Sequence, residues 1–188
     1  MANPTDPLED VALDALTVLF YLPVALGSLL YLFWSGGEFA LFVRTLGEHP
    51  LRDSLAGAAV GLGVVFVTQF TLPRFDVGQR FGAALGRMIG RRPWLSCAVI
   101  AASSSVGEEL LFRAVLQQRL GLAIATVLFA VAHFPVERDL WPWPLMALAL
   151  GLAFGGLYEW SGAALAPIVA HAVINLLNLR FVGRFAPL

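Results

Sequence analysis

The sequence has a single cysteine, no lysine and few charged residues of either sign. Cys97 has no second cysteine with which to form an intramolecular disulfide, and it lies in an apolar run where a buried thiol is expected. The 12 basic residues are all arginines, and with 13 acids they give a net charge of −1. The chain therefore lacks the strongly basic surface of a nucleic-acid-binding protein, and no nucleic acid partner is expected.

Apolar residues are present in excess. They make up 59% of the chain and charged residues 13%, whereas a soluble domain is about half apolar and about a quarter charged. The mean hydropathy is +0.78. These values predict an integral membrane protein. The N-terminal residues carry acids and no basic residue, unlike a signal peptide, so the first apolar run is expected to be retained as a helix.

Six apolar segments approach the length of roughly 20 residues that a membrane-spanning helix needs. They are residues 15–34, 54–72, 94–117, 120–134, 143–160 and 162–181. The sequence therefore predicts an all-α, multi-pass transmembrane helix bundle with about six spanning helices. Because no internal repeat or linker divides the chain, residues 1–188 are expected to form a single integral membrane domain.

The loop at residues 73–93 is rich in arginine. Its apolar residues recur at helical spacing, namely Val77, Phe81, Leu85 and Met88. The arginines fall on a different face, which predicts an amphipathic helix at the membrane interface. The positive-inside rule makes this loop cytoplasmic, and with six spans both termini are then cytoplasmic. A compact chain that uses arginine without lysine is typical of bacteria, so the inner membrane is the expected location.

Several ionisable residues lie inside the apolar segments, where such residues are costly and mostly functional. They are Glu108, Glu109, Arg113, His133 and His171. At about 1.5 Å per helical residue, Glu108 lies about 16 Å, His133 about 20 Å and His171 about 15 Å from turns on the same membrane face. Polar groups from three helices are therefore expected at one level near the bilayer midplane.

The spacing of these residues separates their expected roles. Glu109 and Arg113 are four residues apart, so they face the same side and can pair. Glu108 is rotated by about 100° and has no partner in its own helix, so desolvation disfavours its charged form, as suits a general base. His171 and Asn175 are also four residues apart, and both can donate a hydrogen bond to a developing oxyanion.

Small residues in the same segments are interpreted as packing features. Gly151 and Gly155 form a GxxxG pair, and Ser103, Ser104 and Ser105 form a run of small side chains. Such residues let helices approach closely in a membrane. No chemistry is assigned to either group.

Three short motifs follow one another in order, each within an apolar helix. They are EELLFR at 108–113, FAVAH at 129–133 and HAVIN at 171–175. Together they resemble the EExxxR, FxxxH and HxxxN motifs of the family of CAAX proteases and bacteriocin-processing enzymes, which includes the type II CAAX prenyl endopeptidases and the Abi proteins. The motif-bearing core of the resemblance covers residues 94–180.

The resemblance implies an intramembrane endopeptidase of the glutamic type. The catalytic residues that it implies are Glu108, His133, His171 and Asn175. In this scheme Glu108 and His133 activate a water, while His171 and Asn175 form the oxyanion hole. Glu109 and Arg113 have a supporting role, because their ion pair holds the motif helix.

The resemblance leaves the cofactor and the substrate open. No metal is expected, but the family was long described as metal-dependent, and the alternative is zinc bound by Glu108, His133 and His171 with one position left for water. The expected partners are the lipid bilayer and a peptide or membrane-anchored protein substrate. The chain is short for the family, which favours a bacterial processing enzyme that cleaves leader segments or, like the myxosortases, C-terminal segments.

Two functions of other classes compete with a protease. A non-enzymatic membrane scaffold or immunity protein would be expected to lose at least one motif residue, and this chain keeps all of them. A small transporter or proton channel could also use intramembrane acids and histidines. The absence of an internal repeat in the sequence argues against a transporter.

Overall fold

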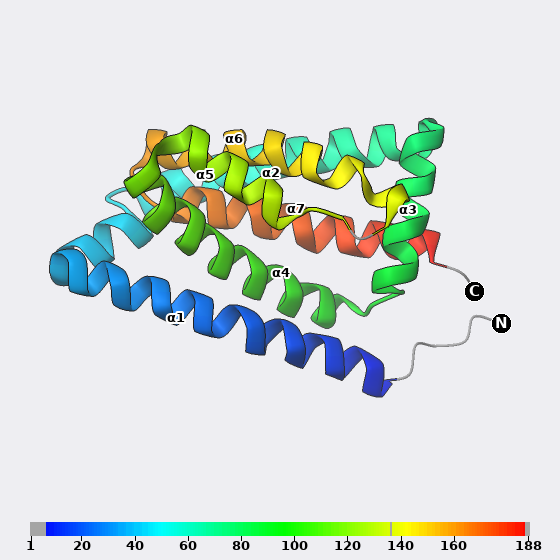
Figure 1. The fold of residues 1–188 in the computed structure, drawn as a ribbon, viewed down its shortest axis with the longest axis horizontal. Helices are drawn as coiled ribbons and strands as arrows, with labels where there is room; N and C mark the ends of the chain where they lie inside the picture. Colours follow the sequence, from blue (N-terminus) through cyan, green and yellow to red (C-terminus); the bar gives the residue numbers. More distant parts are fainter. Residues whose placement is uncertain (1–6, 136, 187–188) are drawn as a thin grey trace.

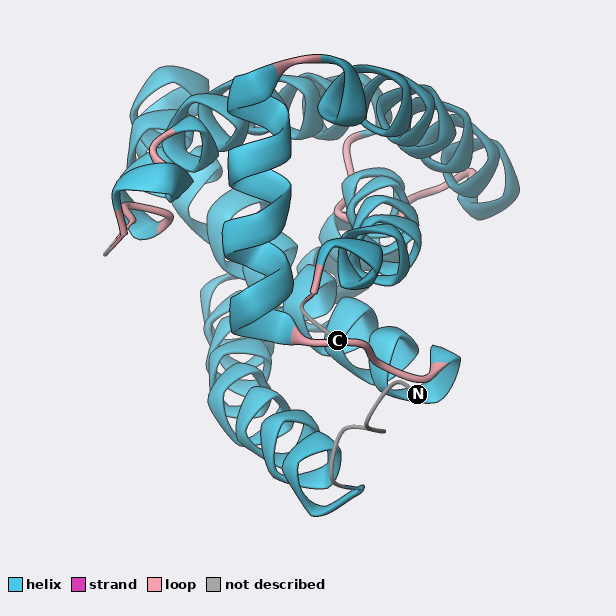
Figure 2. Cartoon of the chain, turned by 90° about the vertical axis from the view of Figure 1, so that its right-hand side faces the viewer, coloured by secondary structure: helices cyan, strands magenta, loops and turns pink. Residues whose placement is uncertain are grey.

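The structure is a computed structural model that describes residues 7–135 and 137–186. Within these ranges it contains helices and loops and no strand (Figure 2). The long helices are α1 (Pro7–Leu46), α2 (Pro50–Thr71), α3 (Asp76–Ile89), α4 (Trp94–Glu109), α5 (Gln118–Ala132), α6 (Pro142–Ser161) and α7 (Leu165–Val182). The shorter helical segments are η1 (Leu72–Arg74), η2 (Leu110–Gln117), η3 (Arg138–Leu140) and η4 (Gly183–Phe185). The predicted all-α fold is confirmed.

Five stretches of the described chain are long and apolar enough to cross a membrane, in place of the six expected. They are Val11–Phe39, Leu41–Arg74, Trp94–Ala132, Arg138–Ser161 and Leu165–Phe185. The third stretch contains two of the expected segments, and Figure 1 shows the chain reversing inside it so that α5 runs back alongside η2. Helix α5 has 15 residues and is interrupted by non-helical backbone at Gly121, so it is shorter than the roughly 20 residues that a span needs. The multi-pass bundle itself is confirmed.

The reversal at the start of α5 depends on glycine. Gly121 has φ +82°, a conformation that side chains with a Cβ rarely adopt. A second glycine in this region of backbone space, Gly37 at φ +70°, bends α1 near its end. These two residues turn apolar sequences that are nearly continuous into separate helices.

Helix α3 lies across one end of the bundle, roughly perpendicular to the long helices (Figures 1 and 2). Phe81 and Leu85 are buried against neighbours that include Leu72 and Val182, while Met88 is half exposed. The amphipathic helix predicted for this loop is therefore present. Helix α1 begins and α7 ends at the same end of the bundle as α3 (Figure 1).

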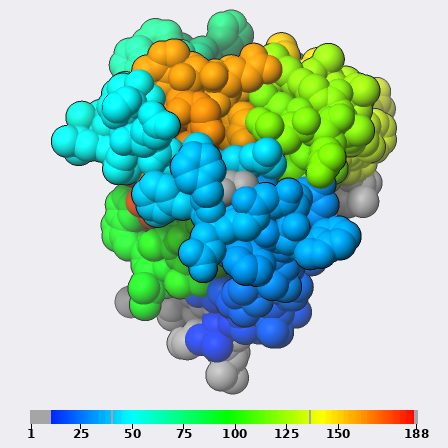
Figure 3. Space-filling view, turned by 90° about the vertical axis from the view of Figure 1, so that its left-hand side faces the viewer, coloured from blue at the N-terminus to red at the C-terminus, as the bar shows by residue number. Residues whose placement is uncertain are grey.

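The opposite end of the bundle is closed by turns that come from distant parts of the sequence. Figure 3 views this end, where the bend of α1, the start of α5 and the turn between α6 and α7 gather on one face. The backbone N–H of Ala164 donates to the carbonyl oxygen of Arg44 at 2.9 Å. This bond joins the last turn of α1 to the start of α7.

Helix α7 is packed closely against α2 through glycines of α2. A Cβ at Gly61 would come within 2.8 Å of the carbonyl oxygen of Ala170, and a Cβ at Gly57 would clash with the carbonyl oxygen of Ala166. Only glycine permits this approach. Because Ala170 immediately precedes His171, the glycines of α2 also fix the depth at which that histidine is held.

The core beside the motif helices is aromatic. Phe129 of α5 meets Phe112 edge to face at 5.1 Å between ring centroids, and Phe154 of α6 at 6.4 Å. All three rings are buried, and Ile174 of α7 packs in the same cluster. Each of the three predicted motifs thus contributes to, or lies next to, one packed cluster.

Candidate active site

Glu109 is the centre of a buried polar cluster. One carboxylate oxygen, Oε2, accepts a hydrogen bond from Nε of Arg113 at 2.9 Å. The other, Oε1, lies 2.8 Å from Nδ1 of His171. The side chains of Glu109 and Arg113 are fully buried. The predicted pairing of these two residues is confirmed, and the structure adds His171 as a third member.

The guanidinium of Arg113 is enclosed by apolar groups. It lies 5.0 Å from the ring centroid of Phe129, within cation–π range. Its Nη1 and Nη2 atoms are buried without a hydrogen-bond partner among the described residues. Removing one partner of a buried ion pair costs about 3–5 kcal/mol, so Arg113 and Glu109 hold the motif helix as a unit.

The helix that carries the two acids changes to a wider type directly after them. Residues Leu110–Gln117 form a π-helix, η2, that contains Arg113. Such segments are rare and occur frequently at functional sites. Arg113 of η2 pairs with Glu109, the last residue of α4, so the ion pair spans the change of helix type.

Glu108 points away from this cluster and has a different partner. The hydroxyl of Tyr21 on α1 donates a hydrogen bond to Oε1 of Glu108 at 2.5 Å. The ring of Tyr21 lies directly against Gly107, where a Cβ would come within 2.8 Å of its Cδ1 atom. Glycine before the acids therefore makes room for the tyrosine that holds the first acid.

The second oxygen of Glu108, Oε2, faces His133. It lies 3.8 Å from Nε2 of the histidine and has no direct hydrogen-bond partner among the described residues. On its other side, Nδ1 of His133 lies 2.7 Å from the carbonyl oxygen of Phe129. A carbonyl oxygen only accepts, so Nδ1 carries the proton, and in the neutral ring Nε2 is then an acceptor. Two acceptors therefore face each other across 3.8 Å.

The HAVIN motif presents its two polar side chains toward the same place. His171 is stacked on Phe154, with ring centroids 5.0 Å apart, and its Nδ1 is engaged by Glu109. Asn175 donates from Nδ2 to the hydroxyl oxygen of Ser104 at 3.0 Å. One N–H of the Asn175 amide remains for another acceptor.

A cleft of about 690 Å³ lies over these groups, within the range of about 300–1,000 Å³ that is usual for ligand sites. Its polar lining includes Tyr21, Ser104, Glu108, His133, His171 and Asn175. The rest is mostly apolar and comes from α1, α3, α4, η2, α7, the end of α5 and Trp143. The cleft thus combines an apolar wall with a small set of convergent polar atoms.

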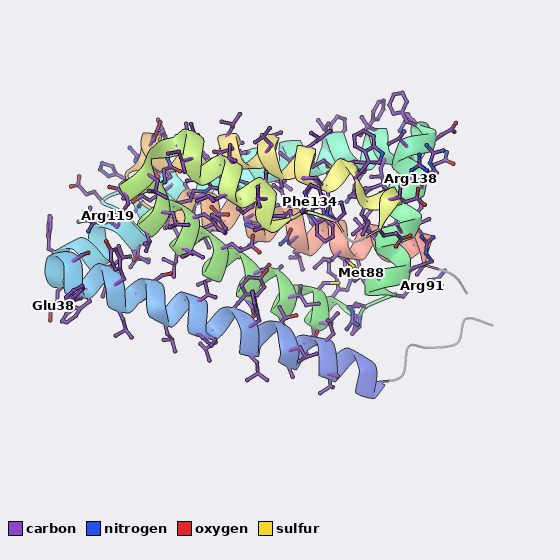
Figure 4. The ribbon with its side chains drawn as sticks, viewed as in Figure 1. Glu38, Met88, Arg91, Arg119, Phe134 and Arg138 are labelled. Carbon is purple, nitrogen blue, oxygen red and sulfur yellow. The ribbon has the colours of Figure 1, made fainter. Side chains whose placement is uncertain are left out.

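The exposed side chains along the cleft show where it opens. Met88 is 50% and Phe134 76% exposed, and both line the cleft. Figure 4 shows them in the half of the bundle nearer α3, whereas Glu38 and Arg119 lie at the opposite end. The part of the opening that these two side chains border is therefore in the half of the bundle that contains α3.

The structure brings together the polar residues that the sequence predicts at one level. Glu108 and His133 face each other, and Glu109, Arg113 and His171 form one connected cluster. The predicted convergence of three helices is thus confirmed as geometry. The catalytic role of each residue stays a prediction.

Two residues of the cleft that form hydrogen bonds with motif side chains were missed from the sequence. Tyr21 lies in the first apolar segment, which carries no motif, and only the folded chain brings it to Glu108. Ser104 was interpreted as a packing residue, but it binds Asn175. Its spacing of four residues before Glu108 places both on one helix face, and this signal could have identified it.

The alternative zinc ligands do not form a ligand cluster as they are placed. In the part of the chain that the structure describes, no group of three or more His, Cys, Asp and Glu side chains is arranged to hold a metal ion. Nδ1 of His171 is engaged by Glu109 and Nδ1 of His133 lies at the Phe129 carbonyl. In both rings these bonds leave Nε2 available, as in a histidine that binds a metal, so the zinc alternative stays a prediction and no chemical step is derived through a metal.

Comparison with known proteins supports the resemblance drawn from the motifs. Residues 90–177 match the family described as type II CAAX prenyl endopeptidase Rce1-like, which confirms that resemblance over the helices that carry the motifs. The chain is also 41% identical over 70 residues to the "uncharacterized protein YpbD" of Bacillus subtilis, which covers 36% of this chain and 35% of that protein. The aligned part is thus about a third of the relative's length. No solved structure matches the chain.

Proposed function

We propose that the chain, which matches the type II CAAX prenyl endopeptidase family over residues 90–177, is an intramembrane endopeptidase that hydrolyses a peptide bond in the cleft. The observation that carries the proposal is the pair of facing acceptors, Oε2 of Glu108 and Nε2 of His133, 3.8 Å apart. A water molecule has two hydrogens to donate, one to each acceptor. The pair is therefore suited to hold and activate a water.

In the proposed reaction, Glu108 acts as the general base. It takes a proton from the water as the water oxygen attacks the peptide carbonyl, and the resulting oxyanion collapses with release of the amine, which receives the proton. His133 orients the water through its second hydrogen. Tyr21, bonded to Oε1, keeps the carboxylate turned so that Oε2 faces the histidine.

Asn175 and His171 stabilise the oxyanion in this scheme. Both line the cleft beside Glu108, and hydrogen-bond donors aimed at a developing oxyanion are among the largest contributions to such reactions. Asn175 has one N–H to spare beyond its bond to Ser104. His171, whose Nδ1 is engaged by Glu109, donates from Nε2 in this scheme when its ring carries both protons.

The walls of the cleft favour an apolar substrate. A peptide or membrane-anchored protein whose cleaved segment is apolar would replace lipid contacts with contacts to α1, α3 and Trp143. We infer processing of leader segments or, as in the myxosortases, of C-terminal segments. We further infer a bacterial inner membrane, with both chain ends and the arginine-rich α3 on the cytoplasmic side, since arginine favours that side.

Glu108→Gln tests the reaction in cells, where the natural substrate is present. Membrane-protein termini are compared by mass spectrometry in deletion cells that carry the wild-type or the variant gene. Removing a general base costs about a hundred-fold or more, so termini that depend on the wild type are expected to disappear. Glu38→Gln is the matched control, because Glu38 is exposed at the opposite end of the bundle (Figure 4). Unchanged termini in the Glu108→Gln cells would refute the proposal and favour a scaffold or immunity role.

Metal dependence is tested on the purified protein with a peptide identified in that comparison. Activity that survives a zinc chelator is the expected result, since the proposed reaction uses Glu108 and His133 alone to activate the water. Activity that is lost on chelation and restored by zinc would instead support the alternative in which Glu108, His133 and His171 are metal ligands.

A further inference from the structure

A smaller cavity of about 150 Å³ adjoins the cleft. The two share the lining residues Ile89, His133, Trp143, His171, Asn175 and Leu179. The cavity extends from these shared residues between α3, α5, α6 and α7, on the side that does not include Glu108. It is therefore a side pocket that begins at the proposed catalytic groups.

The inner wall of this side pocket is apolar. It is formed mainly by Leu85 of α3, Met146, Ala147 and Leu150 of α6, and Ile174 and Val182 of α7. The polar exception is Asn178, whose Oδ1 lies 3.5 Å from Nε2 of Gln69 on α2. A charged group entering the pocket would lose its water without gaining a partner of opposite charge, which is costly.

The volume limits what the side pocket can hold. An apolar cavity of about 150 Å³ in a protein core stays dry and binds benzene. This is the size of one branched aliphatic or one unsubstituted aromatic side chain, and a long lipid chain exceeds it. Both size and lining thus point to a single apolar amino-acid side chain.

We propose that the side pocket is the specificity subsite of the enzyme and accepts one apolar side chain, of the size of leucine, isoleucine, methionine or phenylalanine, from the substrate. The inference rests on the proposed peptidase function. His133, His171 and Asn175 line both cavities, so a residue that inserts its side chain here places its own backbone beside them. The inserted residue therefore adjoins the cleaved bond.

Substitutions on α6 test the size limit in both directions. Leu150→Ala removes an isopropyl group from the wall and Ala147→Leu adds one. Leu152→Ala and Ala149→Leu are the matched controls, since both residues are exposed on the same helix and lie outside the pocket. The probe is a synthetic library of apolar peptides that share one sequence and differ from it at a single position each. The peptides are presented in detergent micelles to each purified variant.

The expected result is a preference of the wild type for leucine-sized to phenylalanine-sized residues at one fixed position next to the cleaved bond. In Leu150→Ala the preference shifts to larger residues and in Ala147→Leu to alanine or glycine, while the controls behave as wild type. One methylene in an apolar pocket changes kcat/KM by about 10- to 200-fold, so shifts of at least ten-fold are expected. Cleavage by Leu150→Ala with the wild-type preference would overturn the subsite and leave the peptidase function standing.

Capture on the Glu108→Gln variant separates the two proposals. This variant lacks the proposed base but keeps the pocket, so library peptides with a suitable residue are expected to be retained without being cut. If the wild type cuts no peptide, the set of peptides retained by Glu108→Gln is compared with the set retained by the double variant Glu108→Gln, Leu150→Ala. A shift of the double variant toward larger residues still supports the subsite. Retention without any size preference would overturn it independently of catalysis.

Discussion

Within residues 7–135 and 137–186, the hydroxyl of Tyr21 donates the hydrogen bond that Glu108 receives from outside the motif helices, and Tyr21→Phe removes that bond. The donor lies 2.5 Å from Oε1 of a carboxyl group whose side chain is 11% exposed. A hydrogen bond to a charged group contributes about 1.5–3 kcal/mol. Because about 1.4 kcal/mol corresponds to ten-fold in rate, Tyr21→Phe is expected to lower kcat by roughly 10- to 150-fold.

The division between kcat and KM shows whether Tyr21 positions the base or only packs α1. The phenyl ring still fills the place beside Gly107 and still lines the cleft, so KM is expected to stay near its wild-type value. Steady-state kinetics on a cleaved peptide in reconstituted vesicles measure both constants. Tyr31→Phe deletes a hydroxyl from the same helix, where the ring lies near Arg119 rather than Glu108, and serves as the control. An unchanged kcat in Tyr21→Phe, or a loss that appears in KM alone, would refute the reasoning.

Three further predictions concern the packing that holds the site. Gly107→Ala places a Cβ 2.8 Å from Cδ1 of Tyr21, so it is expected to lower kcat as Tyr21→Phe does, and additive losses in the double variant would contradict a shared cause. Gly61→Ala drives a Cβ against the backbone of α7 and should cost about 1–3 kcal/mol of stability, measured by thermal unfolding in detergent against Gly63→Ala, whose Cβ would meet open space. Arg113→Leu leaves Glu109 buried without its ion-pair partner and should cost about 3–5 kcal/mol, whereas equal stability of wild type and variant would show that the pair is not buried.

The spacing of side chains along single helices could be interpreted from the sequence, because it depends only on helix geometry. Glu109 and Arg113 pair as expected, and the division between Glu109 and Glu108 follows from their angle on one helix. The common depth of Glu108, His133 and His171 also followed, since alternating helices of known rise place residues at calculable levels. These predictions needed no contact between distant segments.

The partners across helices could not be derived in the same way. Tyr21 lies 87 residues before Glu108, and nothing in its own segment indicates which of its neighbours in space is an acid. Ser104 was assigned to packing because a serine in an apolar helix has that default role, and only its contact with Asn175 shows otherwise. The sequence predicted two helices within residues 94–134, but only the structure shows that the backbone at Gly121, with φ +82°, turns the second of them back along η2.

The sequence by itself therefore determined the membrane class, the all-α fold and the identity of the motif residues. Hydropathy and helical spacing are local properties of the chain, and they do not depend on how the helices pack against one another. Only the tertiary structure decided that α1 completes the surroundings of Glu108, that His133 faces this acid with an acceptor nitrogen, and that an apolar pocket begins beside both histidines. Those features depend on which helices are in contact. Glycines such as Gly107 and Gly61 allow the close approach that these contacts need.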